Sequence, residues 1–250
     1  MRAAAWLCVS LATSALAGEV VTLPAGRFAP LFGLDVGQSS FPVASFRLDV
    51  RPVSRAAFAE FLESNPAWQP GRAPRTLADG RYLASWGDER RPGAPVTEVS
   101  YFAARAYCGW KRGRLPTTLE WEYAAAADET RRDASRESDF VKRILDWYGQ
   151  PNREGDLDGQ GSPRNVYGVE ALHGLVWEWT ADFNALFVTG DNRQDGDVNA
   201  RFMCGSGATG SARREDYAAF MRYALRSSLE PRSTLPRLGF RCAYDVEVTR

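Results

Sequence analysis

The sequence predicts one irregular, loop-rich domain in which short strands and helices are mixed. The chain has 22 glycines and an aromatic share of 12%, whereas long stretches of helical periodicity are scarce. Its charged share of 25% is typical of a globular protein with a substantial core. Residues 18–250 contain no internal repeat and no convincing linker, so we expect them to form a single domain.

Residues 1–17 have the features of a secretory signal peptide. Arg2 supplies a positive start, residues 3–12 are mostly apolar and uncharged, and Ala15 and Ala17 stand at the positions that signal peptidase reads. No later segment approaches the roughly 20 apolar residues of a membrane span. We therefore expect a periplasmic or secreted protein without membrane insertion.

The charge balance gives no indication of a nucleic-acid partner. The chain has 31 basic and 31 acidic residues, and removal of Arg2 with the signal peptide leaves a net charge of −1. The arginines are scattered along the chain rather than gathered in a stripe. We therefore expect no binding of nucleic acid.

The first half of the chain predicts short strands followed by three helices. Prolines and glycines interrupt short apolar runs between residues 20 and 50, as in strands joined by turns. Ser54 and Ser100 are suited to cap two helices, and Thr117 with Glu120 forms a capping box for a third. The apolar positions at helical spacing are Ala57, Phe58, Phe61 and Leu62 in the first helix, Ala103, Ala106, Tyr107 and Trp110 in the second, and Trp121 in the third.

The second half is less regular. Residues 128–146 are strongly charged and form either a solvated helix or an excursion from the domain. Residues 175–180 (LVWEWT) and 238–246 (LGFRCAYDV) are typical of strands. Residues 215–230 have helical spacing, although such a stretch can also join a sheet. That spacing falls on Tyr217, Phe220, Met221 and Ala224. Loops are expected at 65–95, 149–165 and 190–199.

Several familiar catalytic motifs are missing from the sequence. It has no Walker motif and no GxGxxG between a strand and a helix, which argues against a nucleotide site. Residues 156–161 (DLDGQG) resemble the start of a calcium-binding EF loop, but Tyr167 replaces the required bidentate Glu, so a turn is favoured. The single histidine, His173, excludes sites built from two imidazoles and favours a structural role over a catalytic one. The carboxylates beside tryptophans, interpreted as braces of the core, are Glu120, Glu122 and Glu178.

Three of the four cysteines remain after export, since Cys8 lies in the signal peptide and too early in it to indicate lipidation. In an oxidising compartment, three thiols most simply make one bridge and leave one cysteine unpaired. A bridge between Cys108 and Cys242, both among apolar neighbours, would contribute on the order of 4 kcal/mol. Cys204 is then the unpaired thiol. Its Gly- and Ser-rich surroundings suit a reactive sulfur, but composition alone leaves an inert buried cysteine open.

Four segments carry recognisable motifs in a fixed order. They are 41–63 (FPVASFRLDVRPVSRAAFAEFLE), 95–127 (PVTEVSYFAARAYCGWKRGRLPTTLEWEYAAAA), 165–180 (NVYGVEALHGLVWEWT) and 238–243 (LGFRCA). Together they resemble the formylglycine-generating enzyme (sulfatase-modifying factor) family. The C-terminal motifs are most similar to a bacterial branch described as nitrite-reductase accessory or uncharacterised periplasmic proteins. The resemblance implies an irregular α+β fold of the C-type-lectin-like kind and a disulfide between the cysteines matching Cys108 and Cys242.

The resemblance also implies an active-site sulfur. Enzymes of this family oxidise a substrate cysteine to formylglycine with O₂, using copper(I) between two cysteine thiolates, an arrangement that suits a soft ion. By this resemblance Cys204 stands at the position of the first thiolate, so it is the expected catalytic residue and copper ligand. The second thiolate is replaced by Thr209, and Gly205 and Arg201 replace a histidine and a serine of the motif. All these replacements lie at the positions that the resemblance implies are catalytic, and none lies in the motifs that build the fold.

A weak calcium site is a further implication of the resemblance. Its expected ligands are the carboxylate of Glu178 and the backbone carbonyls of Gly174 and Val176. Ala171 and Leu175 lack the side-chain oxygens of the family motif, so Glu178 as a buried cap remains an open alternative. The family's iron-dependent sulfoxide synthases need several histidines, which this sequence does not have.

We therefore expect an exported oxidoreductase, similar to formylglycine-generating enzyme, that acts through Cys204 on a cysteine thiol of a periplasmic protein partner. Copper and calcium are the cofactors that the resemblance implies. The alternative is a non-catalytic binding or maturation accessory module for a periplasmic client such as a copper enzyme. Loss of the second thiolate favours the accessory module, whereas retention of Cys204 favours the enzyme.

Overall fold

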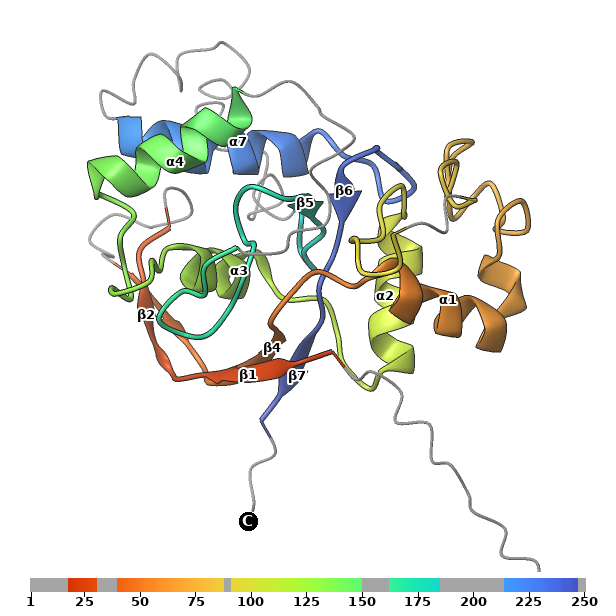
Figure 1. Cartoon of the computed structure of the whole chain (residues 1–250), viewed down its shortest axis with the longest axis horizontal. Coiled ribbons are helices and arrows are strands. Elements are labelled where there is room, and N and C mark those ends of the chain that lie inside the picture. The colour runs from red at the N-terminus through yellow and green to blue at the C-terminus, as the bar shows by residue number, and fades with distance from the viewer. Residues whose placement is uncertain (1–17, 31–39, 88–90, 150–161, 185–213, 247–250) are drawn as a thin grey trace, which may run out of the picture.

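The computed structural model describes residues 18–30, 40–87, 91–149, 162–184 and 214–246, and it confirms the α+β fold class (Figure 1). The strands are β1 (Val20–Leu23), β2 (Gly26–Phe28), β3 (Phe41–Val43), β4 (Phe46–Asp49), β5 (Trp177–Glu178), β6 (Leu238–Gly239) and β7 (Ala243–Asp245). The helices are α1 (Arg55–Ser64), the 3₁₀ turn η1 (Pro66–Trp68), α2 (Tyr101–Trp110), α3 (Thr118–Ala125), α4 (Ser138–Tyr148) and α7 (Arg214–Ser227).

An antiparallel sheet brings the first and last strands of the described chain together. β4 lies between β1 and β7 (Figure 1). Leu48 pairs with Val21 on one side and with Ala243 on the other. Leu48 is fully buried in a cluster that includes Trp121 of α3. Because one face of the sheet is buried, a register slip of one residue would turn these side chains out of the core.

The three predicted helix starts are confirmed. The side chains of Ser54 and Ser100 each accept a hydrogen bond from the backbone N–H three residues later. At α3, Thr117 and Glu120 form the reciprocal capping box that the sequence indicates. Each cap satisfies a backbone donor that the first helical turn leaves without a partner.

An aromatic cluster joins α1 and α2. The ring centroids of Phe58 and Tyr107 are 5.6 Å apart, and Phe240 lies 5.4 Å from Tyr107. The sequence also placed Trp110 on the inner side of α2, which is wrong. Trp110 is the last residue of the helix and remains 37% exposed, although its ring still lies 5.7 Å from that of Phe61.

The second half of the chain departs from the sequence prediction in two ways. The strand expected at 175–180 is only two residues long, and that expected at 238–246 is divided into β6 and β7. The charged segment 128–146 is neither solvated throughout nor a separate excursion. It leads into α4, whose apolar face packs against α7 beside it (Figure 1). The buried residues of that face are Phe140, Val141 and Ile144.

α7 is helical as its spacing indicates, but its buried face differs from the expected one. Tyr217 is 41% exposed, whereas Arg222 and Arg226 are buried together with Ala218 and Tyr223. These arginines point inward because they have a buried carboxylate partner, which hydropathy alone does not show. No helix in the described part of the chain is both long and apolar enough to span a membrane.

Candidate functional site

A fully buried ion pair connects the two short parallel strands to the three-stranded sheet. Glu178 on β5 accepts two hydrogen bonds from Arg241, with Nε–Oε2 and Nη2–Oε1 distances of 2.8 Å each. Trp121 Nε1 donates to the same carboxylate at 2.8 Å. Arg241 also donates to the backbone oxygens of Asp49 and Val50. The hydrogen bonds that Glu178 accepts among the described residues therefore come from buried protein side chains.

A second buried carboxylate lies beneath α7. Glu122 on α3 accepts from Arg222 Nη2 and from Arg226 Nη1, both at 2.7 Å. Burial would raise the pKa of Glu122, but the two guanidinium groups outweigh this effect and hold the pKa well below its usual range. The Arg226 guanidinium also lies 4.5 Å from the centre of the Trp121 ring, a cation–π contact that joins this group to the Glu178 pair.

His173 has a structural role, because its ring is hydrogen-bonded to the backbone and packed against aromatic side chains. Its Nε2 lies 2.8 Å from the carbonyl oxygen of Ala125, and its ring stands edge-on to Trp121 and Phe140. Burial, with the positive charge of Arg222 nearby, lowers the pKa of His173 to about 3. The imidazole is therefore neutral at physiological pH and a poor general base.

The geometry around Glu178 does not fit a calcium ion. Calcium needs six to eight oxygen ligands, including carboxylates free to approach it. The charge of Glu178 is neutralised by Arg241, and the side chain is completely enclosed. Val176 is buried, whereas Gly174 is exposed and has a φ of 95°. Among the described residues no group of three or more His, Cys, Asp and Glu side chains could hold a metal ion.

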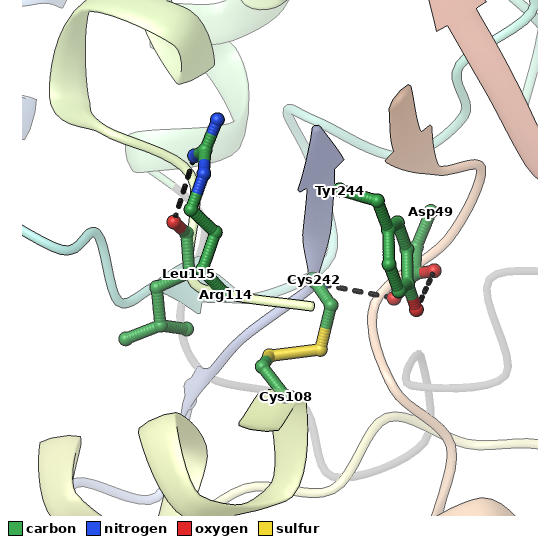
Figure 2. Close-up of a disulfide and its surroundings, with 6 residues drawn as sticks. All are labelled: Asp49, Cys108, Arg114, Leu115, Cys242 and Tyr244. Atoms are coloured by element: carbon green, nitrogen blue, oxygen red, sulfur yellow. Dashed lines mark hydrogen bonds between the residues drawn. A yellow bond between two sulfur atoms is a disulfide. The ribbon is translucent and has the colours of Figure 1, made fainter. Parts of the chain in front are cut away.

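The disulfide between Cys108 and Cys242 is present, as the sequence and the resemblance predict (Figure 2). It ties α2 to the chain just before β7, across a separation of 134 positions. Both cysteines are fully buried. Two of the three cysteines expected in the mature chain are therefore committed to the scaffold.

Sequence reasoning missed a buried acid beside the disulfide. Asp49 Oδ2 accepts from the backbone N–H of Cys242 at 2.9 Å, and Oδ1 accepts from the Tyr244 hydroxyl at 3.1 Å (Figure 2). Burial raises the pKa of Asp49 to about 6, although these hydrogen bonds act in the opposite direction. Asp49 also lines a cleft of about 800 Å³. The signal available in the sequence was an acid at the end of an apolar strand, FRLDV.

Cys204, the expected catalytic residue and copper ligand, lies outside the described residues, as do Arg201, Gly205 and Thr209. Its environment therefore stays a prediction. The first described element after Cys204 in the sequence is α7, which begins at Arg214.

Comparison with known proteins identifies the scaffold. The family model for the sulfatase-modifying factor enzyme 1-like domain matches residues 9–246. A formylglycine-generating enzyme of Streptomyces coelicolor is 35% identical over 177 residues, covering 64% of this chain and 55% of the relative. An inactive C-alpha-formylglycine-generating enzyme 2 of Bos taurus is 33% identical over 193 residues, covering 64% of this chain and 56% of the relative. The chain thus spans about half the length of these curated relatives.

A solved structure supports the same fold. The structure of PvdO from Pseudomonas aeruginosa is similar with a TM-score of 0.50 and 18% identity, covering 92% of this chain and 95% of that one. At this identity the likeness concerns the fold alone. The family match extends over nearly the whole sequence, and its motifs form the buried pair, the capping box and the disulfide described above. The chain belongs to the sulfatase-modifying factor enzyme 1-like family, to which its formylglycine-generating relatives also belong.

Proposed function

We propose that this chain is an exported oxidoreductase, similar to formylglycine-generating enzyme, that acts through Cys204 on a cysteine thiol of a protein partner. The observation that carries the proposal is the use of cysteines. The structure places Cys108 and Cys242 in the scaffold disulfide, and Cys8 lies in the expected signal peptide. Cys204 is then the one sulfur of the mature chain left for thiol chemistry.

The proposed substrate would bring the second sulfur. Copper(I) prefers soft ligands, and Cys204 supplies one thiolate where Thr209 has replaced the second. A copper ion would supply redox chemistry at the pair formed by Cys204 and the partner's cysteine. The chain's own part is to present Cys204, which precedes α7 in the sequence, on a scaffold held by the disulfide and by the buried ion pairs.

Anaerobic copper(I) titration of the mature protein tests this proposal, with a cysteine-containing peptide present or absent. We expect wild type to bind copper and to bind it more tightly when the peptide thiol is present. Cys204→Ser should abolish both effects, and Thr209→Cys should strengthen binding without the peptide because it restores a second thiolate. Equal copper binding by wild type and Cys204→Ser would contradict the proposal. A serine-for-cysteine peptide is the matched control.

Export is tested separately. The proposal predicts that the protein recovered from the periplasm or the medium begins at Gly18, which intact-mass measurement detects. Full-length protein retained in the cytoplasm would contradict it.

The alternative proposal is a non-catalytic accessory module that binds a periplasmic client such as a copper enzyme. One observation favours it: a relative at 33% identity is named inactive. This alternative predicts that Cys204→Ser keeps full client maturation in cells and that the purified protein takes up no copper(I). Loss of maturation in Cys204→Ser, with folding unchanged, would instead support the oxidoreductase.

A further inference from the structure

A cleft of about 800 Å³ lies where α1, α2 and the end of β4 meet. Sites for small molecules in proteins typically have volumes of about 300–1,000 Å³ and mostly apolar walls with a few polar groups. The apolar residues of this cleft include Val50, Pro52, Val53, Ala57, Pro92 and Pro95. The cleft therefore has the size and the lining of a small-molecule site, and the function proposed above assigns nothing to it.

Two helix faces with charged residues form walls of this cleft. On α1, Ala56 and Glu60 lie four positions apart and both line the cleft. Residues at this spacing are neighbours on one face of a helix. Tyr107 on α2 and Lys111 at its C-terminal cap have the same spacing and also line the cleft, and the Lys111 backbone N–H donates to the Tyr107 oxygen at 3.0 Å. Glu60 and Lys111 therefore belong to the helix faces that border the cleft.

The charged ends of both side chains act on less exposed groups of the same wall. Burial raises the pKa of Asp49, and the ammonium of Lys111 acts in the opposite direction. Burial also raises the pKa of Tyr107, and the carboxylates of Asp49 and Glu60 add to that effect. Asp49 and Tyr107 both line the cleft. The carboxylate of Glu60 and the ammonium of Lys111 therefore lie near the part of the wall that these two residues form.

Glu60 and Lys111 differ from the other charged groups of the cleft. Among the described residues neither of them takes part in an ion pair, and the Lys111 ammonium lies 5.5 Å from the centre of the Trp110 ring. Both carboxylate oxygens of Asp49 already accept internal hydrogen bonds. The charged residues of the cleft that pair with one another are Glu19, Arg51, Arg164 and Glu170. One carboxylate and one ammonium are thus available to a ligand of complementary charge.

We propose that this cleft binds a small apolar zwitterion, either an apolar amino acid or a short apolar peptide with both ends free, whose ammonium pairs with Glu60 and whose carboxylate pairs with Lys111. The apolar part of the ligand suits the prolines and aliphatic side chains of the wall. A ligand with a charge of one sign would leave one of the two protein charges without a partner. The two charges therefore select a ligand that carries both signs.

The test is isothermal titration calorimetry of the mature protein with leucyl-leucine, its N-acetyl form and its C-terminal amide. The N-acetyl form lacks the ammonium, and the amide lacks the carboxylate. We expect leucyl-leucine to bind saturably and about fivefold more tightly than either blocked form, the effect of one charged contact. Free leucine distinguishes the two sources of the ligand. Tighter binding than that of leucyl-leucine would assign the cleft to amino acids, and weaker binding would assign it to peptides.

Variants of the two charged residues locate the site. Glu60→Gln should weaken the binding of leucyl-leucine about fivefold and leave that of the N-acetyl form unchanged, because the N-acetyl form has no ammonium. Lys111→Met should weaken the binding of leucyl-leucine similarly and leave that of the amide unchanged. Glu63→Gln on α1 and Lys142→Met on α4 are the matched controls, since these residues do not line the cleft, and they should leave all affinities unchanged.

Three results would overturn the proposal. The first is the absence of saturable binding at millimolar leucyl-leucine. The second is equal affinity of wild type for leucyl-leucine and both blocked forms, which is decisive without any variant. The third is a loss in Glu60→Gln or Lys111→Met that is as large for the corresponding blocked form as for the free peptide. Binding of leucyl-leucine should be the same in Cys204→Ser, so the outcome is separate from that of the copper titration.

Discussion

Glu178 and Arg241 form a doubly hydrogen-bonded ion pair in which neither side chain is exposed to solvent. Their geometry explains why the residues around Glu178 do not fit a calcium ion. The arginine supplies the positive charge next to the carboxylate and is itself fixed by backbone oxygens of β4 and its neighbour. The pair thus fastens β5 to the central strand.

Glu178→Gln should lower the free energy of unfolding by about 3–5 kcal/mol, because it leaves a buried guanidinium without a compensating charge. Urea denaturation followed by circular dichroism measures this change. Asp146→Asn is the matched control, since it removes an exposed ion pair with Lys142 and should cost less than about 0.5 kcal/mol. Similar losses for the two variants would contradict the assigned role. Added calcium should stabilise neither variant nor wild type.

The disulfide should contribute roughly 4–5 kcal/mol to stability, because it closes a loop of 134 positions in the unfolded chain. The double variant Cys108→Ser/Cys242→Ser should show this loss in urea denaturation. Mass spectrometry of unreduced digests should find one peptide pair joining Cys108 to Cys242. Any peptide that links Cys204 to either residue would contradict the assignment.

Asp49 should make the folded state less stable as the pH rises from about 4 to 6. Its folded pKa of about 6 lies above the ordinary value of 3.8, so the native state binds more protons than the unfolded state in that interval. The stabilisation that protonated Asp49 contributes, roughly 3 kcal/mol, is fully present below about pH 4 and is lost by about pH 6. Asp49→Asn should remove this contribution, so the variant should gain stability relative to wild type as the pH rises through the interval and should be more stable than wild type at pH 8, as urea denaturation across pH can show.

The Asn variant can keep both contacts, with its oxygen accepting from Cys242 and its amide donating to the Tyr244 hydroxyl. Tyr244→Phe is the control that removes one contact but keeps the carboxyl. An unchanged pH profile in Asp49→Asn would exclude Asp49 as the titrating group.

Gly239 should not tolerate a side chain. A Cβ at this position would lie 2.6 Å from the carbonyl oxygen of Val96, so Gly239→Ala should destabilise the fold by roughly 1–3 kcal/mol. Gly109, on the exposed side of α2, has nothing within 4 Å of the corresponding position. Gly109→Ala should therefore stabilise the helix by about 0.5–1 kcal/mol. Thermal denaturation distinguishes these opposite signs, and a loss in both variants would contradict the prediction.

The features that could be predicted from the sequence are those set by residues close together in the chain. Capping at Ser54, Ser100 and Thr117 depends on residues three positions apart, and the structure has all three caps. The α+β class and the disulfide were also predicted, the latter supported by the family resemblance. These features need little knowledge of distant partners.

The buried arginines could not be predicted from local pattern. Arg222 and Arg226 are placed inside by Glu122, which precedes them by 100 and 104 positions. Hydropathy assigns such residues to the surface, so the apolar spacing of α7 suggested the wrong face. Asp49 was missed for the same reason, since its partners Cys242 and Tyr244 lie almost 200 positions later. The expected site at Cys204 lies outside the described residues and stays a prediction.

The position of β7 in the chain has a consequence for the order of folding. One neighbour of β4 in the sheet, β1, precedes it closely in the sequence, but the other, β7, consists of residues 243–245. The contact of Asp49 with Cys242 likewise spans 193 positions. Newly made β4 therefore keeps one edge without a partner until almost all of the polypeptide has been synthesised. A nascent chain that completes its sheet so late is exposed to edge-to-edge aggregation for longer, and we expect it to depend on holding chaperones during synthesis.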